Sequence, residues 1–206
     1  MEKNSKKRFC TRRIHCRLIM QSPYRFIISP KENKQYDNAL KIGDRELILS
    51  TSIENAEDVQ RHAIIKALPM KYQGELKVDD EVIVHHNIFR ITYSDKGVPL
   101  QSNFYIKENL FYAKEDVIFM VIRNGVKRGV HGNCFVEPVE IVHPIAGKGR
   151  LPHVGVIKYG CKELEETNVL EGQKIVFKRY CEYEFLIDKE KLYKIDHKNI
   201  LAKISK

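Results

Sequence analysis

From residue 42 to residue 204, short runs of β-branched and aromatic residues alternate with Gly, Asp, Asn and Pro. Residues of the first kind suit a pleated, half-buried strand, and residues of the second kind form turns. Strands this short and this frequent favour a barrel or a sandwich over a sheet with crossover helices. The predicted strands cover 46–49, 81–84, 88–92, 103–106, 117–122, 134–141, 154–158, 174–180, 183–187 and 199–204.

Two stretches outside this rhythm need separate interpretation. Residues 24–30 are apolar enough to be extended, and a polar link follows them to residue 41. Thr51 and Glu54 have the spacing of a capping box, which would allow a helix over about 52–60. The run Ala63-Ile64-Ile65 fits a strand equally well, and we prefer the strand because the segment recurs later in the chain.

The chain contains an internal repeat, which is best sought before any motif. Four blocks recur in the same order at offsets of 89, 92, 93 and 82 residues. An extra segment of about ten residues near 91–104 accounts for the shorter last offset. The repeat predicts a basic arm and extended linker over 1–41 and two small β units over 42–121 and 132–206. The blocks pair 43–49 with 132–138, 62–66 with 154–158, 79–84 with 172–177, and 110–118 with 192–200.

Both units resemble the small β-barrel of the GroES-type co-chaperonins, in a divergent, virus-like tandem form. The second unit is more similar, through Gly155-Val-Ile-Lys-Tyr-Gly160, Val169-Leu-Glu-Gly-Gln-Lys-Ile-Val-Phe177 and Asn199-Ile-Leu-Ala-Lys-Ile204. The first unit carries Lys77-Val-Asp-Asp-Glu-Val-Ile-Val84 in a matching place. Asp or Gly in these turns can adopt the left-handed conformation before the strand. The resemblance implies a mainly β fold of two tandem barrels.

The same resemblance implies a function without chemistry of its own. Such a protein caps or modulates a large chaperonin during ATP-dependent protein folding. In the family an aliphatic tripeptide in a mobile loop docks on the chaperonin, and Ile141, Val142 and Ile145 are the matching residues here, without the family's Gly-Gly-Ile-Val-Leu sequence. In the first unit 50–61 is short and acidic, with Ile53 as its only strong anchor.

The resemblance also predicts an assembly and a compartment. The closing strand of the family pairs across subunits and helps to close a homo-oligomeric ring. Ile200, Ala202 and Ile204 alternate along the matching strand, so we expect them on one face as subunit contacts. The predicted location is the cytoplasm, or the host cytoplasm for a viral protein.

Charge and aromatic residues support two alternatives to this interpretation. Residues 1–20 hold seven of the basic side chains against one acid, so most of the net charge of +9 lies in this arm. The arm could contact nucleic acid through phosphate, or it could be a flexible leader. Phe104, Tyr105, Phe111 and Tyr112 either fill a barrel interior or stack single-stranded bases. The third hypothesis is a structural component of a larger viral assembly.

No motif for catalysis, a metal or a cofactor is present. There is no P-loop, no Gly-x-Ser-x-Gly and no His-Glu-x-x-His, so the chain is not predicted to be an enzyme. Five widely spaced cysteines include no Cys-x-x-Cys pair, which argues against zinc. His85 and His86 are adjacent, and neighbours in a strand point to opposite faces, so the pair is a poor metal site. No apolar run is long enough to span a membrane, and the basic N-terminus lacks the apolar region of a secretory signal.

Overall fold

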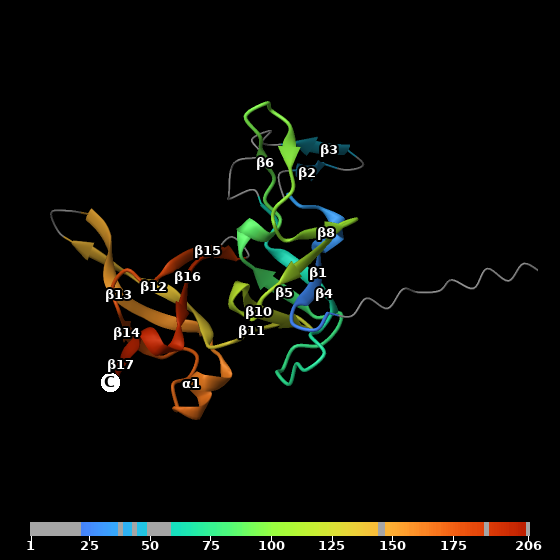
Figure 1. Cartoon of the computed structure of the whole chain (residues 1–206). Coiled ribbons are helices and arrows are strands. Elements are labelled where there is room, and N and C mark those ends of the chain that lie inside the picture. Colours follow the sequence, from blue (N-terminus) through green and yellow to red (C-terminus); the bar gives the residue numbers. More distant parts are fainter. Residues whose placement is uncertain are drawn as a thin grey trace, which may run out of the picture.

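A computed structural model describes residues 22–36, 39–42, 45–48, 59–143, 147–187 and 190–204. The fold is mainly β and is built from two antiparallel sheets that lie side by side, one blue to yellow-green and the other yellow to red in Figure 1. The basic arm over 1–20 lies outside the described residues.

The first sheet has seven strands in the order β11-β10-β5-β4-β1-β9-β8. These are β1 (Phe26–Pro30), β4 (His62–Ala67), β5 (Glu81–Val84), β8 (Tyr105–Lys107), β9 (Leu110–Ala113), β10 (Ile118–Arg123) and β11 (Val126–Gly129). The second sheet has six strands in the order β15-β16-β12-β13-β14-β17. These are β12 (Asn133–His143), β13 (Gly147–Tyr159), β14 (Lys174–Phe177), β15 (Tyr183–Ile187), β16 (Glu190–Asp196) and β17 (Ile200–Ile204).

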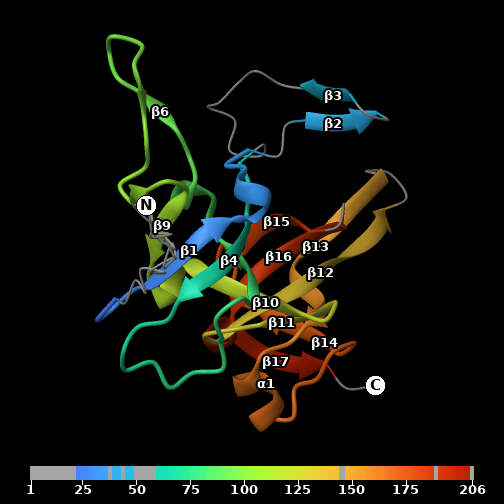
Figure 2. The same ribbon diagram turned by 90° about the vertical axis from the view of Figure 1, so that its right-hand side faces the viewer.

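Short elements connect these strands. Two small hairpins stand away from the sheets in both views (Figures 1 and 2): β2 (Ala39–Ile42) with β3 (Arg45–Ile48), and β6 (Thr92–Tyr93) with β7 (Pro99–Leu100). The second of them forms the extra segment predicted near 91–104. The helical turns are η1 (Lys31–Asn33), η2 (His86–Ile88), η3 (Glu115–Val117) and η4 (His197–Asn199), and the single described α-helix is α1 (Lys162–Glu166).

The two sheets repeat one topology. Six strands of the first sheet match the six strands of the second, and the order of the matched strands is the same in both sheets. The matches are β1 with β12, β4 with β13, β5 with β14, β8 with β15, β9 with β16, and β10 with β17. The registers agree as well in the pairs that join β1, β4, β5, β9 and β10 to one another and in their counterparts in the second sheet. The matched pairs include Ile28↔Ile65 with Val136↔Ile157, Ile28↔Phe111 with Val136↔Tyr193, Ala63↔Val82 with Gly155↔Ile175, and Val84↔Ile118 with Phe177↔Ile200.

Three of the four predicted repeat blocks are therefore confirmed, and the first is wrong. All of the block 132–138 except its first residue falls in β12, whose structural counterpart is β1 and not 43–49. Pro30 and Pro138 end the matching stretches opposite Ala63 and Gly155. Residues 26–30, which the sequence placed in a linker, form a fully buried strand between β4 and β9.

The repeated turn before β5 and β14 follows the predicted chemistry. Asp79 and Gly172 both adopt positive φ, at 68° and 80°. Their amides donate to the carbonyls of Ile65 and Ile157, at 2.8 Å in each case. A positive φ favours Gly and is tolerated by Asp, so each unit uses a residue that its turn allows.

Neither sheet closes into a barrel within the described part of the chain. β11 and β8 are the two ends of the first sheet, and β15 and β17 are the two ends of the second. The expectation of closed barrels is corrected to two open antiparallel sheets, each with its own core. Their cores are centred on Phe26, Phe89 and Phe111 in the first sheet, and on Ile157, Ile175 and Phe177 in the second.

Local predictions were mixed. The strands at 81–84 and 183–187 are confirmed, and β4 confirms the preferred strand at 63–65. The predicted strand at 88–92 is wrong, because His86–Ile88 form the helical turn η2, which ends where the amide of Phe89 donates to the carbonyl of His86. The strand predicted to reach residue 180 ends at Phe177, and Tyr180 has a left-handed φ of 64°.

Candidate partner-binding surfaces

The predicted docking residues lie at the end of a long hairpin. β12 and β13 continue past the sheet, with Ile141 opposite Gly149 and Val142 opposite Lys148. The backbone at Ile141 and Val142 is therefore paired, where the sequence predicted a mobile loop. Ile145 lies outside the described residues. Figure 1 shows this hairpin projecting from the second sheet, at the left of the view.

The first sheet has a second projection at the same point of its topology. The connection from β1 to β4 corresponds to the one from β12 to β13, and it carries the hairpin of β2 and β3. The sequence had placed the matching loop of the first unit at 50–61, whereas the structural connection begins directly after Pro30. Each repeated unit therefore sends out a hairpin between its equivalent strands (Figure 2).

The closing strand β17 does not place its predicted contact residues on one face. Ile200 is opposite Phe177, and Ala202 is opposite Val176, so Leu201 forms a bulge between them. A bulge shifts the alternation of side chains by one residue. Ile200 therefore packs against the second core, while Ala202 and Ile204 are exposed. The expectation that Ile200, Ala202 and Ile204 share a face is wrong for this reason.

Sequence reasoning missed Leu201, which has an exposed side chain at 66%. It occupies the bulge position that Phe119 holds in β10 of the first sheet. The signal was available, because the offset of 82, extended one residue past the last repeat block, aligns these two residues. Within the described residues, β17 pairs only with β14, so one edge of this strand is open.

Aromatic and cationic side chains fill the space between the two sheets. The guanidinium of Arg61 lies 4.4 Å from the ring centre of Phe185. His85 and His86 stack at 4.3 Å, and the Tyr183 hydroxyl lies 2.7 Å from Nδ1 of His86. The two adjacent histidines thus serve the contact between the sheets, because Tyr183 comes from β15 and the histidines follow β5.

Burial sets the protonation of these histidines. Burial, with a further contribution from the neighbouring His85, Arg61 and Arg90, lowers the pKa of His86 from 6.5 to about 4. Burial and the nearby Arg61 and Lys194 also lower the pKa of His85. Because two cations already lie against the aromatic rings, a third charge here would be poorly solvated. Both histidines are therefore neutral at pH 7.

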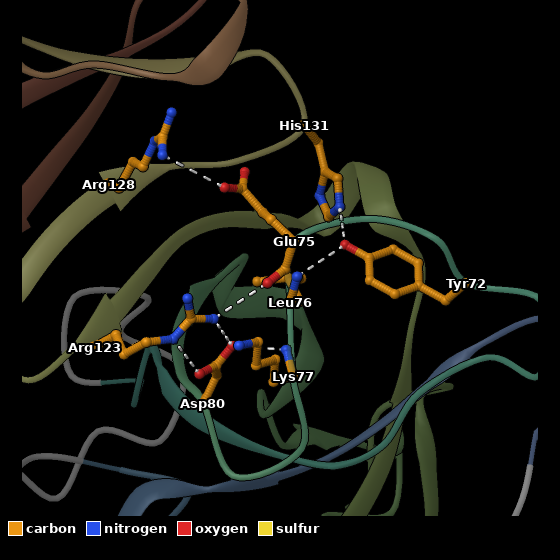
Figure 3. Close-up of polar contacts among 8 residues, drawn as sticks. All are labelled: Tyr72, Glu75, Leu76, Lys77, Asp80, Arg123, Arg128 and His131. Atoms are coloured by element: carbon orange, nitrogen blue, oxygen red, sulfur yellow. Dashed lines mark hydrogen bonds and ion pairs between the residues drawn. The ribbon is translucent and has the colours of Figure 1, made fainter.

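A polar network joins the loop over 72–80 to β10 and to residues 130–132, which connect the first sheet to the second and are called the crossing (Figure 3). Arg123 donates two hydrogen bonds to the buried carboxylate of Asp80, at 2.9 and 2.5 Å. The amide of Lys77 donates to the same group at 2.7 Å. Burial would raise the pKa of Asp80, but these bonds outweigh it and lower the pKa. The hydroxyl of Tyr72 lies 3.4 Å from Nε2 of His131, which is on the crossing.

The described residues offer little for chemistry. Among them no group of three His, Cys, Asp or Glu residues could hold a metal ion. Cys134 and Cys161 are buried free thiols, and burial raises the pKa of Cys161 to about 12 and that of Cys134 further still. A thiol with so high a pKa is a poor nucleophile, because the thiolate is the reactive form.

The aromatic residues near 104–112 belong largely to the core. Phe111 is fully buried and meets Phe89 edge to face at 4.9 Å. Phe104 packs against the same core, and only Tyr105 is exposed, at 39%. This arrangement favours the interior role over base stacking.

No helix in the described part of the chain has the length and hydropathy needed to cross a membrane. Comparison with known proteins leaves the structural repeat as the main guide to function. No protein-family model matches the chain, and no curated protein sequence matches it significantly.

Proposed function

We propose that this protein acts as a co-chaperonin-like cap: it binds a large chaperonin through its projecting hairpins and performs no chemistry itself. The observation that supports this proposal is the repeated topology, with a hairpin leaving each sheet between equivalent strands. This is the connection in which the family resembled by the sequence carries its chaperonin-binding segment. The two sheets then correspond to two tandem GroES-like units, opened rather than closed.

The hairpin geometry changes the expected energetics of docking. An unpaired loop loses backbone freedom when it binds, at a cost of about 1–2 kcal/mol for each ordered residue. Ile141 and Val142 already sit in a paired strand. We therefore expect a smaller ordering cost than for a free loop. Two hairpins in one chain also raise the overall affinity by holding the second close to its site.

The test is association with a large chaperonin loaded with ATP. Replacing Ile141 and Val142 by Ser removes two aliphatic side chains, each worth about 1.5–3 kcal/mol when buried. The affinity should then fall by about two to four orders of magnitude, since 1.4 kcal/mol is tenfold. Sedimentation of the mixture, with and without ATP, measures this loss.

A matched control removes two exposed aliphatic side chains elsewhere in the second sheet region. Leu170→Ser with Leu186→Ser changes residues that are 46% and 68% exposed, outside the hairpin. This control should bind as the wild type does. The proposal fails if the wild-type protein shows no ATP-dependent association, or if the hairpin variant binds as tightly as the control.

A further inference from the structure

The turn that joins β14 to β15 gathers exposed cations around one exposed aromatic ring. Lys178, Arg179 and Tyr180 follow one another directly after β14, and all three side chains are exposed. The amide of Lys178 donates to the carbonyl of Asn199 at 2.8 Å, which places the exposed Lys198 of η4 beside this turn. We call Lys178, Arg179, Tyr180 and Lys198 the basic turn surface.

The three cations of this surface are not used by the fold. Within the described part of the chain, none of their side chains has an ion pair or a hydrogen bond, whereas Lys158 of the same sheet pairs with Glu190 at 3.2 Å. The nearby carboxylates are the exposed Glu182 and the half-buried Asp196, and an oxygen of Asp196 already accepts the amide of Lys198 at 2.9 Å. Cations therefore outnumber carboxylates here, and the surface favours an anionic partner.

Tyr180 has a conformation and an exposure that folding does not explain. Its side chain is 92% exposed, and its backbone has a left-handed φ of 64°. That conformation is unfavourable for a bulky residue and is adopted most easily by Gly, as at Gly172. No aromatic ring or cation among the described residues packs against the ring of Tyr180. A strained residue whose side chain makes no contact in the fold points to a role in binding.

The corresponding turn of the first unit shows that the fold needs no charge here. By the matched registers, Lys178 and Arg179 hold the positions of His85 and His86. The amide of His85 donates to the carbonyl of Val117 at 3.0 Å, just as the amide of Lys178 donates to its own partner. Because neutral histidines form the same turn, the cations belong to the second unit alone.

We propose that the basic turn surface binds single-stranded nucleic acid, with its cations on the phosphates and a base stacked on the ring of Tyr180. Cations that neutralise phosphates release counterions, which drives binding. Stacking of a base on an exposed aromatic ring adds an interaction that tolerates any sequence. The bases of a duplex are already stacked on one another, so this ring selects single strands. An acidic polypeptide would use the charges and leave the ring unused.

The experiment titrates fluorescently labelled oligothymidine and oligouridine with the full-length protein and follows anisotropy at several salt concentrations, without chaperonin. Tyr180→Gly removes the ring and suits the left-handed backbone, and it should weaken binding by about 5- to 150-fold, the loss of one stacked base. Tyr180→Phe keeps the ring and should bind as the wild type does. The oligonucleotide that binds more tightly identifies the preferred nucleic acid as DNA or RNA.

The cations are tested through the salt slope, which is the slope of log affinity against log salt concentration. Lys178→Gln with Arg179→Gln should reduce this slope by about 1.4, since each phosphate contact on a single strand contributes about 0.7. The matched control is Lys162→Gln with Lys191→Gln, which removes the same charge from residues that pair with carboxylates outside the surface. This control should leave the salt slope nearly unchanged. Every variant retains the basic arm, so the arm does not contribute to the differences.

Two further controls concern the ring. Tyr93→Ala removes a ring that is 42% exposed on the β6–β7 hairpin, and this variant should bind as the wild type does. In urea unfolding, Tyr180→Gly should be about as stable as the wild type, because relief of the left-handed strain offsets the greater freedom of Gly in the unfolded chain.

A wild type that binds neither oligonucleotide would overturn the proposal. So would a Tyr180→Gly variant that binds as tightly as Tyr180→Phe, since the ring would then have no part in recognition. Equal salt slopes for the two double variants would also overturn it, because the cations would then contact no phosphate. Polyglutamate that displaces the oligonucleotides and binds Tyr180→Gly undiminished would assign the surface to an acidic protein instead.

Discussion

Phe185 is the residue on which the contact between the two sheets most depends. Its side chain is 1% exposed, and its ring centre lies 5.6 Å from Phe119, 5.7 Å from Phe135 and 5.1 Å from Tyr183. The guanidinium of Arg61 also covers the ring. Replacing Phe185 by Ala removes the ring from a site whose neighbours come from both sheets, so the cavity cannot collapse without moving one sheet.

The expected cost follows from this environment. Deleting a buried Phe side chain lowers the free energy of unfolding by about 3–5 kcal/mol. Losing the cation–π contact adds about 0.5–2 kcal/mol. A typical domain is stable by about 5–15 kcal/mol, so Phe185→Ala should remove a large part of the total.

Urea unfolding followed by circular dichroism measures this change. Leu186→Ala is the control, because its side chain is 68% exposed on the same strand and should change stability by no more than about 0.5 kcal/mol. A loss below about 1.5 kcal/mol for Phe185→Ala would refute the reasoning, since it would mean that the ring is not held between the sheets.

Three further predictions concern single side chains. Because the pKa of His86 falls to about 4 on folding, only the unfolded chain binds a proton at this residue between about pH 6.5 and 4, so the free energy of unfolding should decline as the pH falls through this window. The free energy of unfolding of His86→Gln should decline less between pH 7 and 4.5. An equal decline would contradict the lowered pKa of His86. The lowered pKa of Asp80 stabilises the fold above the unfolded pKa of about 3.9, and this contribution is lost as the pH falls through the folded pKa. Asp80→Asn should therefore cost about 1–3 kcal/mol at pH 7 and flatten the acid limb of the stability curve, and an unchanged acid limb would argue against the ion pair. Gly172→Ala should lower the free energy of unfolding by about 1–2 kcal/mol through its positive φ alone, because no atom lies within 4 Å of the added methyl group. Asp79→Gly should not destabilise the matching turn. Equal losses of the two variants in denaturant unfolding would contradict the match between the turns.

The sequence by itself determined the features that depend on local chemistry. The turns at Asp79 and Gly172 follow from which residues tolerate positive φ, and the strands β5 and β15 follow from runs of β-branched and aromatic residues. Three repeat blocks could be aligned because each turn is joined to its strand within a few residues. The mainly β class follows from the same local signals, and the extra segment near 91–104 follows from the shorter last offset of the repeat.

Only the tertiary structure decided the features that depend on distant partners. Phe26–Pro30 has no local signal that separates a linker from a central strand, and its role depends on partners at 63–67 and 111–113. The bulge at Leu201 is invisible in the alternation of Ile200, Ala202 and Ile204, because it depends on how β17 pairs with β14. The paired state of Ile141 and Val142, the open sheets and the aromatic contact around Phe185 likewise arise from pairing and packing between segments far apart in the chain, which no local pattern encodes.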